Sequence, residues 1–238
     1  MEIEIPARFC GPPDMANGGY LAGRLAALLG GVADVSLRRA TPLDRPLLIE
    51  RFDGGLRLLD GDAVLAEARA AEAPDVELPE PVSLADAATA ARSFPRFVDH
   101  PVPGCFVCGT ERPDGFRIFP GPVPGREEIY AAPWTPDPSL GDETSLVRPE
   151  FLWAALDCTG AFAVNEPPRG LALLARIAAR IDERPRVGEP LVVIGWPIAR
   201  EGRRLEPGTA ILTPRGRAVA VARATWVLTN PRRPAEVS

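Results

Sequence analysis

Two stretches of the chain are apolar over the length of a helix, and each carries one charged side chain in its interior. The first, 15–31, has leucines at helical spacing, Asn17 ahead of them as a helix N-cap, and Arg24 as its only charge. The second, 149–164, contains Asp157 as its only charge beyond the first two residues. A helix that is apolar all round is a buried helix. The pattern therefore predicts two buried helices, one with an arginine and one with a carboxylate in its middle.

Strand-like runs with alternating polarity follow each helix, separated by turn residues. The predicted strands are 2–5, 34–40, 45–52, 55–59, 63–71, 117–119, 128–134, 171–181, 190–200, 204–214 and 217–229. Asp53-Gly54 is a strong hairpin signal between two of them. A break at 165–170 ends the second helix. In each half we expect a helix followed by an antiparallel meander.

The two halves resemble each other in sequence. Asp62-Ala-Val-Leu-Ala-Glu-Ala-Arg-Ala matches Gly216-Arg-Ala-Val-Ala-Val-Ala-Arg-Ala. The intervening stretch is rich in Pro, Asp and Glu, which indicates a linker, with one short helix predicted after a Ser83 cap. We therefore predict an internal duplication with an N-terminal unit at 1–75, a linker at 76–103 and a C-terminal unit at 104–238.

Composition narrows the chemistry. The 238 residues carry a net charge of −5, which leaves no basic footprint for nucleic acid or for a membrane surface. No run has the length of a membrane-spanning helix, and the first residues lack the pattern of a signal peptide, so we expect a cytoplasmic protein. All basic residues are arginine, which excludes lysine chemistry, and His100 is the only histidine, which excludes mechanisms that need two.

The cysteines form one C-x-x-C pair, Cys105 and Cys108, in a loop rich in Gly and Pro. A structural zinc site needs four ligands, so a metal would have to recruit His100 together with Cys10 or Cys158 from distant parts of the chain. A redox pair normally lies in a βαβ unit, which is not predicted here. We interpret the pair as small buried thiols in a reducing compartment and predict neither a metal nor a cofactor.

Four motifs resemble the hotdog-fold acyl-CoA thioesterase superfamily in its tandem form. They are Asn17-Gly-Gly-Tyr-Leu-Ala, Gly104-Cys-Phe-Val-Cys-Gly, Trp153-Ala-Ala-Leu-Asp-Cys and the final run 216–227. The resemblance implies an α+β double hotdog, in which two antiparallel sheets each wrap one long buried helix. It also implies hydrolysis of an acyl-CoA or acyl-carrier thioester.

The resemblance also implies roles for particular residues. Gly18-Gly19 match the helix start where a backbone N–H polarises the thioester carbonyl, and Asp157 matches the aspartate that activates water or attacks that carbonyl. Long-chain enzymes of the family add a threonine and a glutamine on strands. This chain has no glutamine, the threonine position falls near Ala175, and Thr225 lies close to the glutamine position.

Physical chemistry supports part of this assignment. The first amides of a helix are unsatisfied and sit at the positive end of its dipole, so Gly19 and Tyr20, behind the Asn17 cap, are candidate oxyanion donors. Asp157 is then the base or nucleophile. The alternatives are a carboxylate that only satisfies backbone or arginine donors, and glycines that only permit close helix–sheet packing.

Gly18, Arg24 and Trp153 complete the candidate site as substrate-binding residues. Arg24 could bind a phosphate or form a buried ion pair with Asp14 or Asp157, and Trp153 fits the core as well as an acyl pocket. The first helix offers Arg24 where a second site would need a carboxylate, so we predict one site per chain. Two units can pair within one chain, so a monomer is feasible, and a homodimer is also compatible with the sequence. The alternative function is a non-catalytic module that binds acyl-CoA or lipid; a hydratase is disfavoured because His100 lies in the linker.

Overall fold

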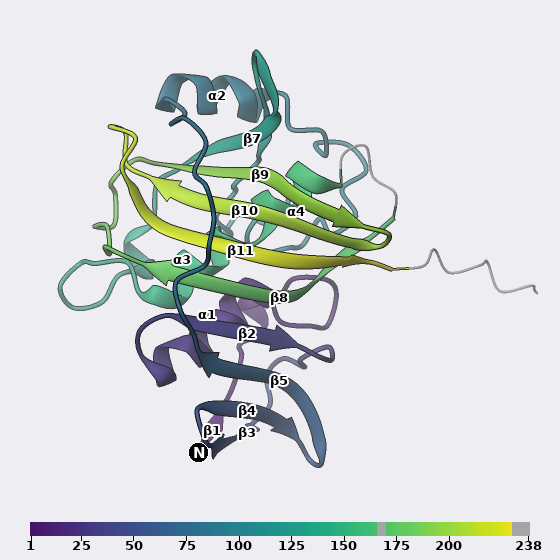
Figure 1. Ribbon diagram of the computed structural model, residues 1–238. Coiled ribbons are helices and arrows are strands. Elements are labelled where there is room, and N and C mark those ends of the chain that lie inside the picture. The colour runs from purple at the N-terminus through teal and green to yellow at the C-terminus, as the bar shows by residue number, and fades with distance from the viewer. Residues whose placement is uncertain (166–169, 230–238) are drawn as a thin grey trace, which may run out of the picture.

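The computed structural model describes residues 1–165 and 170–229. Its strands form a single antiparallel sheet in the order β1-β3-β4-β5-β2-β8-β11-β10-β9-β7-β6, a long curved surface in Figure 1. The strands are β1 (Glu2–Ile3), β2 (Ala33–Leu37), β3 (Leu47–Phe52), β4 (Gly55–Asp60), β5 (Ala63–Ala70), β6 (Gly121–Val123), β7 (Arg126–Trp134), β8 (Ala172–Ile181), β9 (Leu191–Glu201), β10 (Arg204–Leu212) and β11 (Ala218–Leu228). The predicted break at 165–170 and the end of the predicted unit 104–238 lie partly outside the described residues.

The strand order is the same on both sides of its centre. Outward from the middle run β2, β5, β4, β3 and β1 on one side, and β8, β11, β10, β9 and β7 on the other, where β6 is added at the edge. β2 and β8 pair directly, with Val35 opposite Ile177. This symmetry supports the predicted duplication. The prediction of two separate sheets is wrong, because the β2–β8 pairing joins the halves into one sheet. The boundaries 1–75, 76–103 and 104–238 stay a prediction.

Within each half only part of the sheet is a meander. β3, β4 and β5 follow one another through tight turns, and Asp53-Gly54 forms the predicted hairpin. β2, however, pairs with β5 and not with β3, because a long connection carries the chain across the sheet after β2. The predicted strand at 117–119 is wrong: Arg117 has φ 56, which interrupts an extended run, and β6 begins only at Gly121.

The first helix, α1 (Gly18–Leu29), begins as predicted, with the Asn17 side chain accepting a hydrogen bond from the Tyr20 amide. It packs against α3 (Pro149–Ala155). A Cβ added at Gly19 would lie 2.6 Å from the Trp153 carbonyl oxygen, and one added at Gly23 would lie 2.6 Å from the Glu150 Cα. Gly19 and Gly23 therefore permit a close helix–helix contact, whereas Gly18 faces Leu37 of β2 and Leu174 of β8, which agrees with the alternative of close helix–sheet packing.

The second predicted helix is broken at its aspartate. The chain leaves helical geometry at Asp157, with φ −77 and ψ −81, and resumes as α4 (Cys158–Val164). Thr209 of β10 donates its hydroxyl to the Leu156 carbonyl at 2.9 Å, which satisfies an acceptor that the break releases. Because α3 packs on α1 whereas α4 packs on β9 and β10, the break directs the two halves of this segment to different partners.

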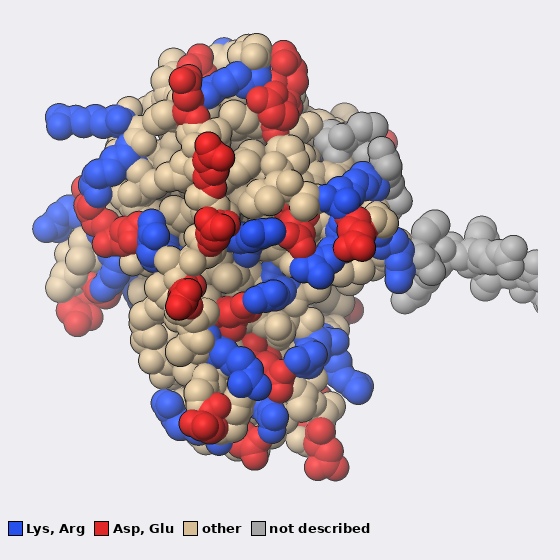
Figure 2. Space-filling model, viewed as in Figure 1, with Lys and Arg blue, Asp and Glu red and all other residues tan. Residues whose placement is uncertain are grey.

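The linker forms α2 (Leu84–Arg92) with Ser83 as its N-cap, as predicted. It covers β6 and β7 at the top of Figure 1 and closes a small second core. The face shown in Figure 2 carries acidic and basic side chains intermingled. Ion pairs between neighbouring strands, such as Arg176 with Asp34, span the seam between β2 and β8. No helix among the described residues is long and apolar enough to span a membrane.

Candidate functional site

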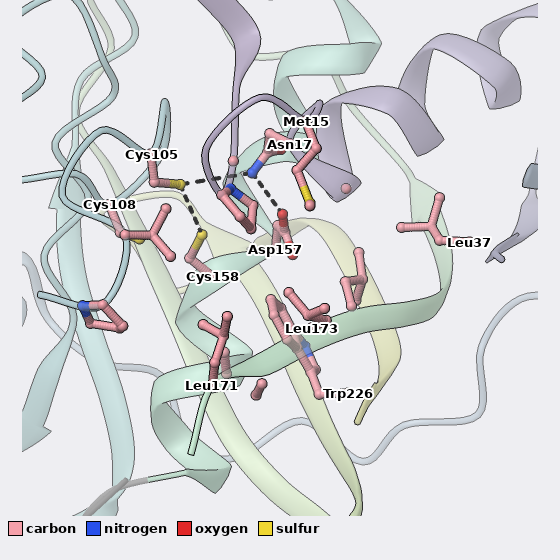
Figure 3. Close-up of a pocket in the computed structure, with 18 of the residues that line it drawn as sticks. Met15, Asn17, Leu37, Cys105, Cys108, Asp157, Cys158, Leu171, Leu173 and Trp226 are labelled. Carbon is pink, nitrogen blue, oxygen red and sulfur yellow. Dashed lines mark hydrogen bonds between the residues drawn. The ribbon is translucent and has the colours of Figure 1, made fainter. Parts of the chain in front are cut away.

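A cavity of about 420 Å³ opens where the start of α1, the loop before β6, α4 and the first residues of β8 meet. Its walls are largely apolar, and Figure 3 shows Asp157 among them with Asn17, Cys105 and Cys158 nearby. The principal apolar lining residues are Met15, Leu21, Leu37, Phe162, Leu171, Leu173, Leu174 and Trp226. The cavity is lined by residues from both halves of the chain.

Asp157 is held by the start of the opposite helix. It is 2% exposed, and its Oδ2 accepts hydrogen bonds from the Asn17 side-chain amide at 2.8 Å and from the Gly19 backbone amide at 3.0 Å. Its Oδ1 has no hydrogen-bond partner among the described residues. The sequence placed Asp157 in the middle of a helix; the helix break instead brings it to the N-terminus of α1, with one oxygen bound and one unoccupied.

The environment of Asp157 makes it a stronger base than an ordinary carboxylate. Burial raises its pKa from 3.8 to about 7, while the hydrogen bonds from Gly19 and Asn17 oppose that rise. A carboxyl group with a pKa in this range can take up and return a proton near neutral pH.

The amides at the start of α1 are not arranged as the sequence predicted. The Tyr20 amide donates to Asn17 Oδ1 at 2.9 Å, and the Gly19 amide donates to Asp157, so both predicted oxyanion donors are already bonded. Gly18 is the first residue of the helix and lines the cavity. Within the described chain its amide has no partner. The unoccupied donor is therefore Gly18, one residue earlier than predicted.

Three other predicted site residues lie away from the cavity. Thr225 is on β11 opposite Arg176, and its buried neighbour Trp226 takes the place on the cavity wall. Trp153 is 2% exposed in the contact between α3 and α1, so it is a core residue. Arg24 donates to the Tyr20 hydroxyl at 3.1 Å instead of pairing with a carboxylate, and it does not line the cavity.

Sequence reasoning missed several residues that the fold brings to the cavity. Trp226 lines it, and its indole nitrogen is buried without a hydrogen-bond partner among the described residues. Arg38 and Arg39 follow β2 at the cavity, and Arg96 approaches from the linker. These segments are far apart in sequence and meet only in the folded chain; Arg38 and Arg39 reach the cavity because β2 pairs with β8. Cys158 also joins the C-x-x-C pair here, with 3.7 Å between its sulfur and that of Cys105.

No protein-family model matches the sequence, and no curated protein matches it. Solved structures do. The acyl-CoA thioesterase II TesB2 of Mycobacterium marinum aligns with a TM-score of 0.60 at 15% identity, over 97% of this chain and 93% of that chain. The tesB protein of Mycobacterium avium subsp. paratuberculosis aligns with a TM-score of 0.60 at 12% identity, over 96% and 92%.

A protein of unknown function with a hotdog fold from Alicyclobacillus acidocaldarius gives a TM-score of 0.56 at 12% identity, over 97% of this chain and 93% of that chain. This chain has the hotdog fold. The alignments run over nearly the whole length, so both halves of the hotdog chain take part in the likeness. At such low identities the likeness establishes the fold, and the chemistry has to be argued from the site itself.

Proposed function

We propose that this chain hydrolyses acyl thioesters of coenzyme A or of an acyl-carrier protein, at a single site built by two hotdog units. The observation that carries the proposal is Asp157, a buried carboxylate with one oxygen that has no hydrogen-bond partner among the described residues, on the wall of a cavity that Gly18, the first residue of α1, also lines. The full-length likeness to thioesterase structures agrees with this choice.

The reaction needs an apolar place for the acyl chain, a donor for the carbonyl oxygen and a base for water. Leu171, Leu173 and Trp226 supply apolar walls. The Gly18 amide, at the positive end of the helix dipole, donates to the carbonyl oxygen as negative charge develops there. Asp157 Oδ1 removes a proton from water, whose oxygen bonds to the carbonyl carbon. The carbon–sulfur bond then breaks, and the departing thiolate takes the proton from Asp157.

Asn17 acts as a positioning residue in this mechanism. Its side chain caps α1 through the Tyr20 amide and donates to Asp157 Oδ2, so it fixes the carboxylate relative to the helix start. With Oδ2 held by Asn17 and Gly19, only Oδ1 is available to water. The proposed arrangement uses Asp157 as a base; direct attack of Oδ1 on the carbonyl is the variant of the same mechanism with an anhydride intermediate.

The test is release of free thiol from a panel of acyl-CoAs of increasing chain length, followed with a thiol-reactive dye. Turnover that saturates with substrate and is lost in Asp157→Asn supports the proposal. Incorporation of one oxygen atom from labelled water into the acid without prior labelling of the protein supports the base role; labelled Asp157 after a single turnover supports direct attack.

A second candidate function is non-catalytic binding of acyl-CoA or lipid. The observation that favours it is the occupation of the Gly19 and Tyr20 amides by side chains of the protein itself, which leaves a single helix donor for substrate. Saturable binding of acyl-CoAs without thiol release from any of them would select this function over hydrolysis.

A further inference from the structure

Three cysteines that are distant in sequence converge beside the cavity. Cys105 and Cys108 come from the loop after the linker, and Cys158 is the first residue of α4. Their sulfur atoms all lie within 4.8 Å of one another, and the residues are 3%, 4% and 7% exposed. Figure 3 shows Cys105 and Cys158 turned toward each other, with Cys108 beside them. All of the cysteines are free thiols.

The spacing of the sulfurs matches that of metal ligands. Zinc–thiolate bonds of about 2.3 Å in a tetrahedron place the sulfurs about 3.8 Å apart. The Cys105 and Cys158 sulfurs are 3.7 Å apart, whereas a disulfide would require about 2 Å. A disulfide would also use only two of the three thiols and leave the third without a role.

Polar groups surround the Cys105 sulfur closely. The side chains of Cys108 and Cys158 and the amides of Cys108 and Val107 lie around it. The Asn17 side-chain amide also reaches this sulfur, at 4.0 Å. The loop is tight: the Gly109 amide donates to the Cys105 carbonyl at 2.9 Å, and a Cβ at Gly109 would lie 2.4 Å from that oxygen.

We propose that Cys105, Cys108 and Cys158 bind one Zn²⁺ ion through three thiolates. Soft sulfur ligands in a tetrahedral arrangement select zinc over the hard cations magnesium and calcium. Within the described chain no histidine or carboxylate atom belongs to the group, so the fourth ligand is water or a donor atom from a bound molecule. The cluster borders the cavity, from which such a ligand enters.

Two of the three partners considered from the sequence, His100 and Cys10, are engaged elsewhere. His100 accepts a hydrogen bond from the Val102 amide through Nδ1 at 2.9 Å, so in the neutral ring Nε2 carries the proton and is not a metal donor. The Cys10 thiol donates a hydrogen bond to the Gly104 carbonyl at 3.2 Å, and its sulfur accepts one from the Arg112 guanidinium at 2.9 Å. The third partner, Cys158, does join the pair, because the helix break after Leu156 turns it toward the loop.

A zinc ion at this place would tie the C-x-x-C loop to the start of α4 and so hold the residue before Cys158, Asp157, in position. The site does not depend on the proposed hydrolysis, and its test uses no turnover. The protein is produced in zinc-supplemented medium, purified without chelators or a histidine tag, and analysed for metal. We expect about one zinc per chain, falling below about one tenth in Cys105→Ser and in Cys158→Ser. Cys10→Ser is the matched control and keeps the zinc.

A second measurement covers variants that fail to fold. In the wild-type chain, native alkylation should leave the three clustered cysteines unmodified until a chelator is added, and Co²⁺ taken up by the metal-free protein should give sulfur-to-cobalt absorption bands. The proposal is overturned if purified protein holds no zinc, added Zn²⁺ does not protect these thiols, and Co²⁺ gives no such bands. It is also overturned if Cys10→Ser loses the metal as Cys158→Ser does.

Discussion

Replacement of Asp157 by Asn tests the proposed chemistry with the smallest change in shape. The amide oxygen of Asn can still accept from Asn17 and Gly19, as Oδ2 does now at 2.8 and 3.0 Å. Its NH₂ group takes the place of Oδ1, which has no partner among the described residues. The geometry around the helix start is therefore retained, while the group that would remove a proton from water is lost.

The size of the effect follows from these contacts. A positioned general base contributes about 10²- to 10⁴-fold to a rate, so kcat should fall by that factor, which corresponds to about 2.7 to 5.4 kcal/mol in the barrier. Because the base acts in the transition state and not on bound substrate, kcat and kcat/KM should fall together. The free energy of unfolding should change little. Unbonded N–H groups on the new amide would cost about 1–3 kcal/mol, but the substitution also removes the cost of burying a carboxylate.

The assay is thiol release from the best acyl-CoA of the panel, with a thermal melt for each variant. Asp62→Asn, in the exposed turn between β4 and β5, is the matched control and should keep both rate and Tm. A folded Asp157→Asn variant that keeps more than half of the wild-type kcat/KM would refute the assignment of Asp157. Loss of activity together with collapse of the melt would instead indicate a structural role.

Three further outcomes are expected. Gly19→Ala should lower the free energy of unfolding by about 1–3 kcal/mol, because its Cβ would lie 2.6 Å from the Trp153 carbonyl oxygen and 2.7 Å from Asp157 Cβ. The Cβ of Gly18→Ala would meet only leucine side chains, which can move, so the Tm of this variant should fall less. Trp226→Phe should raise KM about 2- to 10-fold in thiol release if the unpartnered indole N–H binds substrate; an unchanged KM contradicts that. Asp142→Asn should lower Tm at pH 7, because hydrogen bonds from Thr144 and Arg184 hold the pKa of Asp142 below its unfolded value. That stabilisation is complete above the unfolded pKa and is lost as pH falls through the folded one, so the two melts should begin to approach each other below about pH 4 and meet only at more acidic pH.

The sequence predicted the elements better than their arrangement. Local signals such as the Asn17 cap and the Asp53-Gly54 hairpin were sufficient, because caps and tight turns depend on adjacent residues. The joining of the halves by β2 and β8 could not be predicted, since strand pairing over such a separation leaves no local pattern. The break at Asp157 was missed for a related reason: its compensation, the Thr209 hydroxyl on Leu156, comes from a distant strand.

The site was predicted in part for the same reasons. The sequence predicted Asp157, Asn17 and the glycines, because a lone carboxylate in an apolar helix and an N-cap are local patterns within one segment. The sequence could not predict which amide at the start of α1 stays without a partner, because that depends on the hydrogen bond that the Gly19 amide donates to Asp157 from the neighbouring segment. Trp226 was missed in favour of its neighbour Thr225, since a shift of one residue along a strand reverses the face to which a side chain points.

The near-symmetry of the fold argues for one site per chain more strongly than the sequence did. At the start of α3 the N-cap is Arg148, which makes no side-chain cap, and the first helical residue is Pro149, where α1 has Gly18. Proline has no N–H, so the mirrored position lacks the unoccupied donor as well as a carboxylate, because α1 contains no acidic residue. The duplicated halves have thus diverged into a donor helix and a carboxylate segment. Titration with a non-hydrolysable acyl-CoA analogue should saturate at one molecule per chain; two equal sites would contradict the argument.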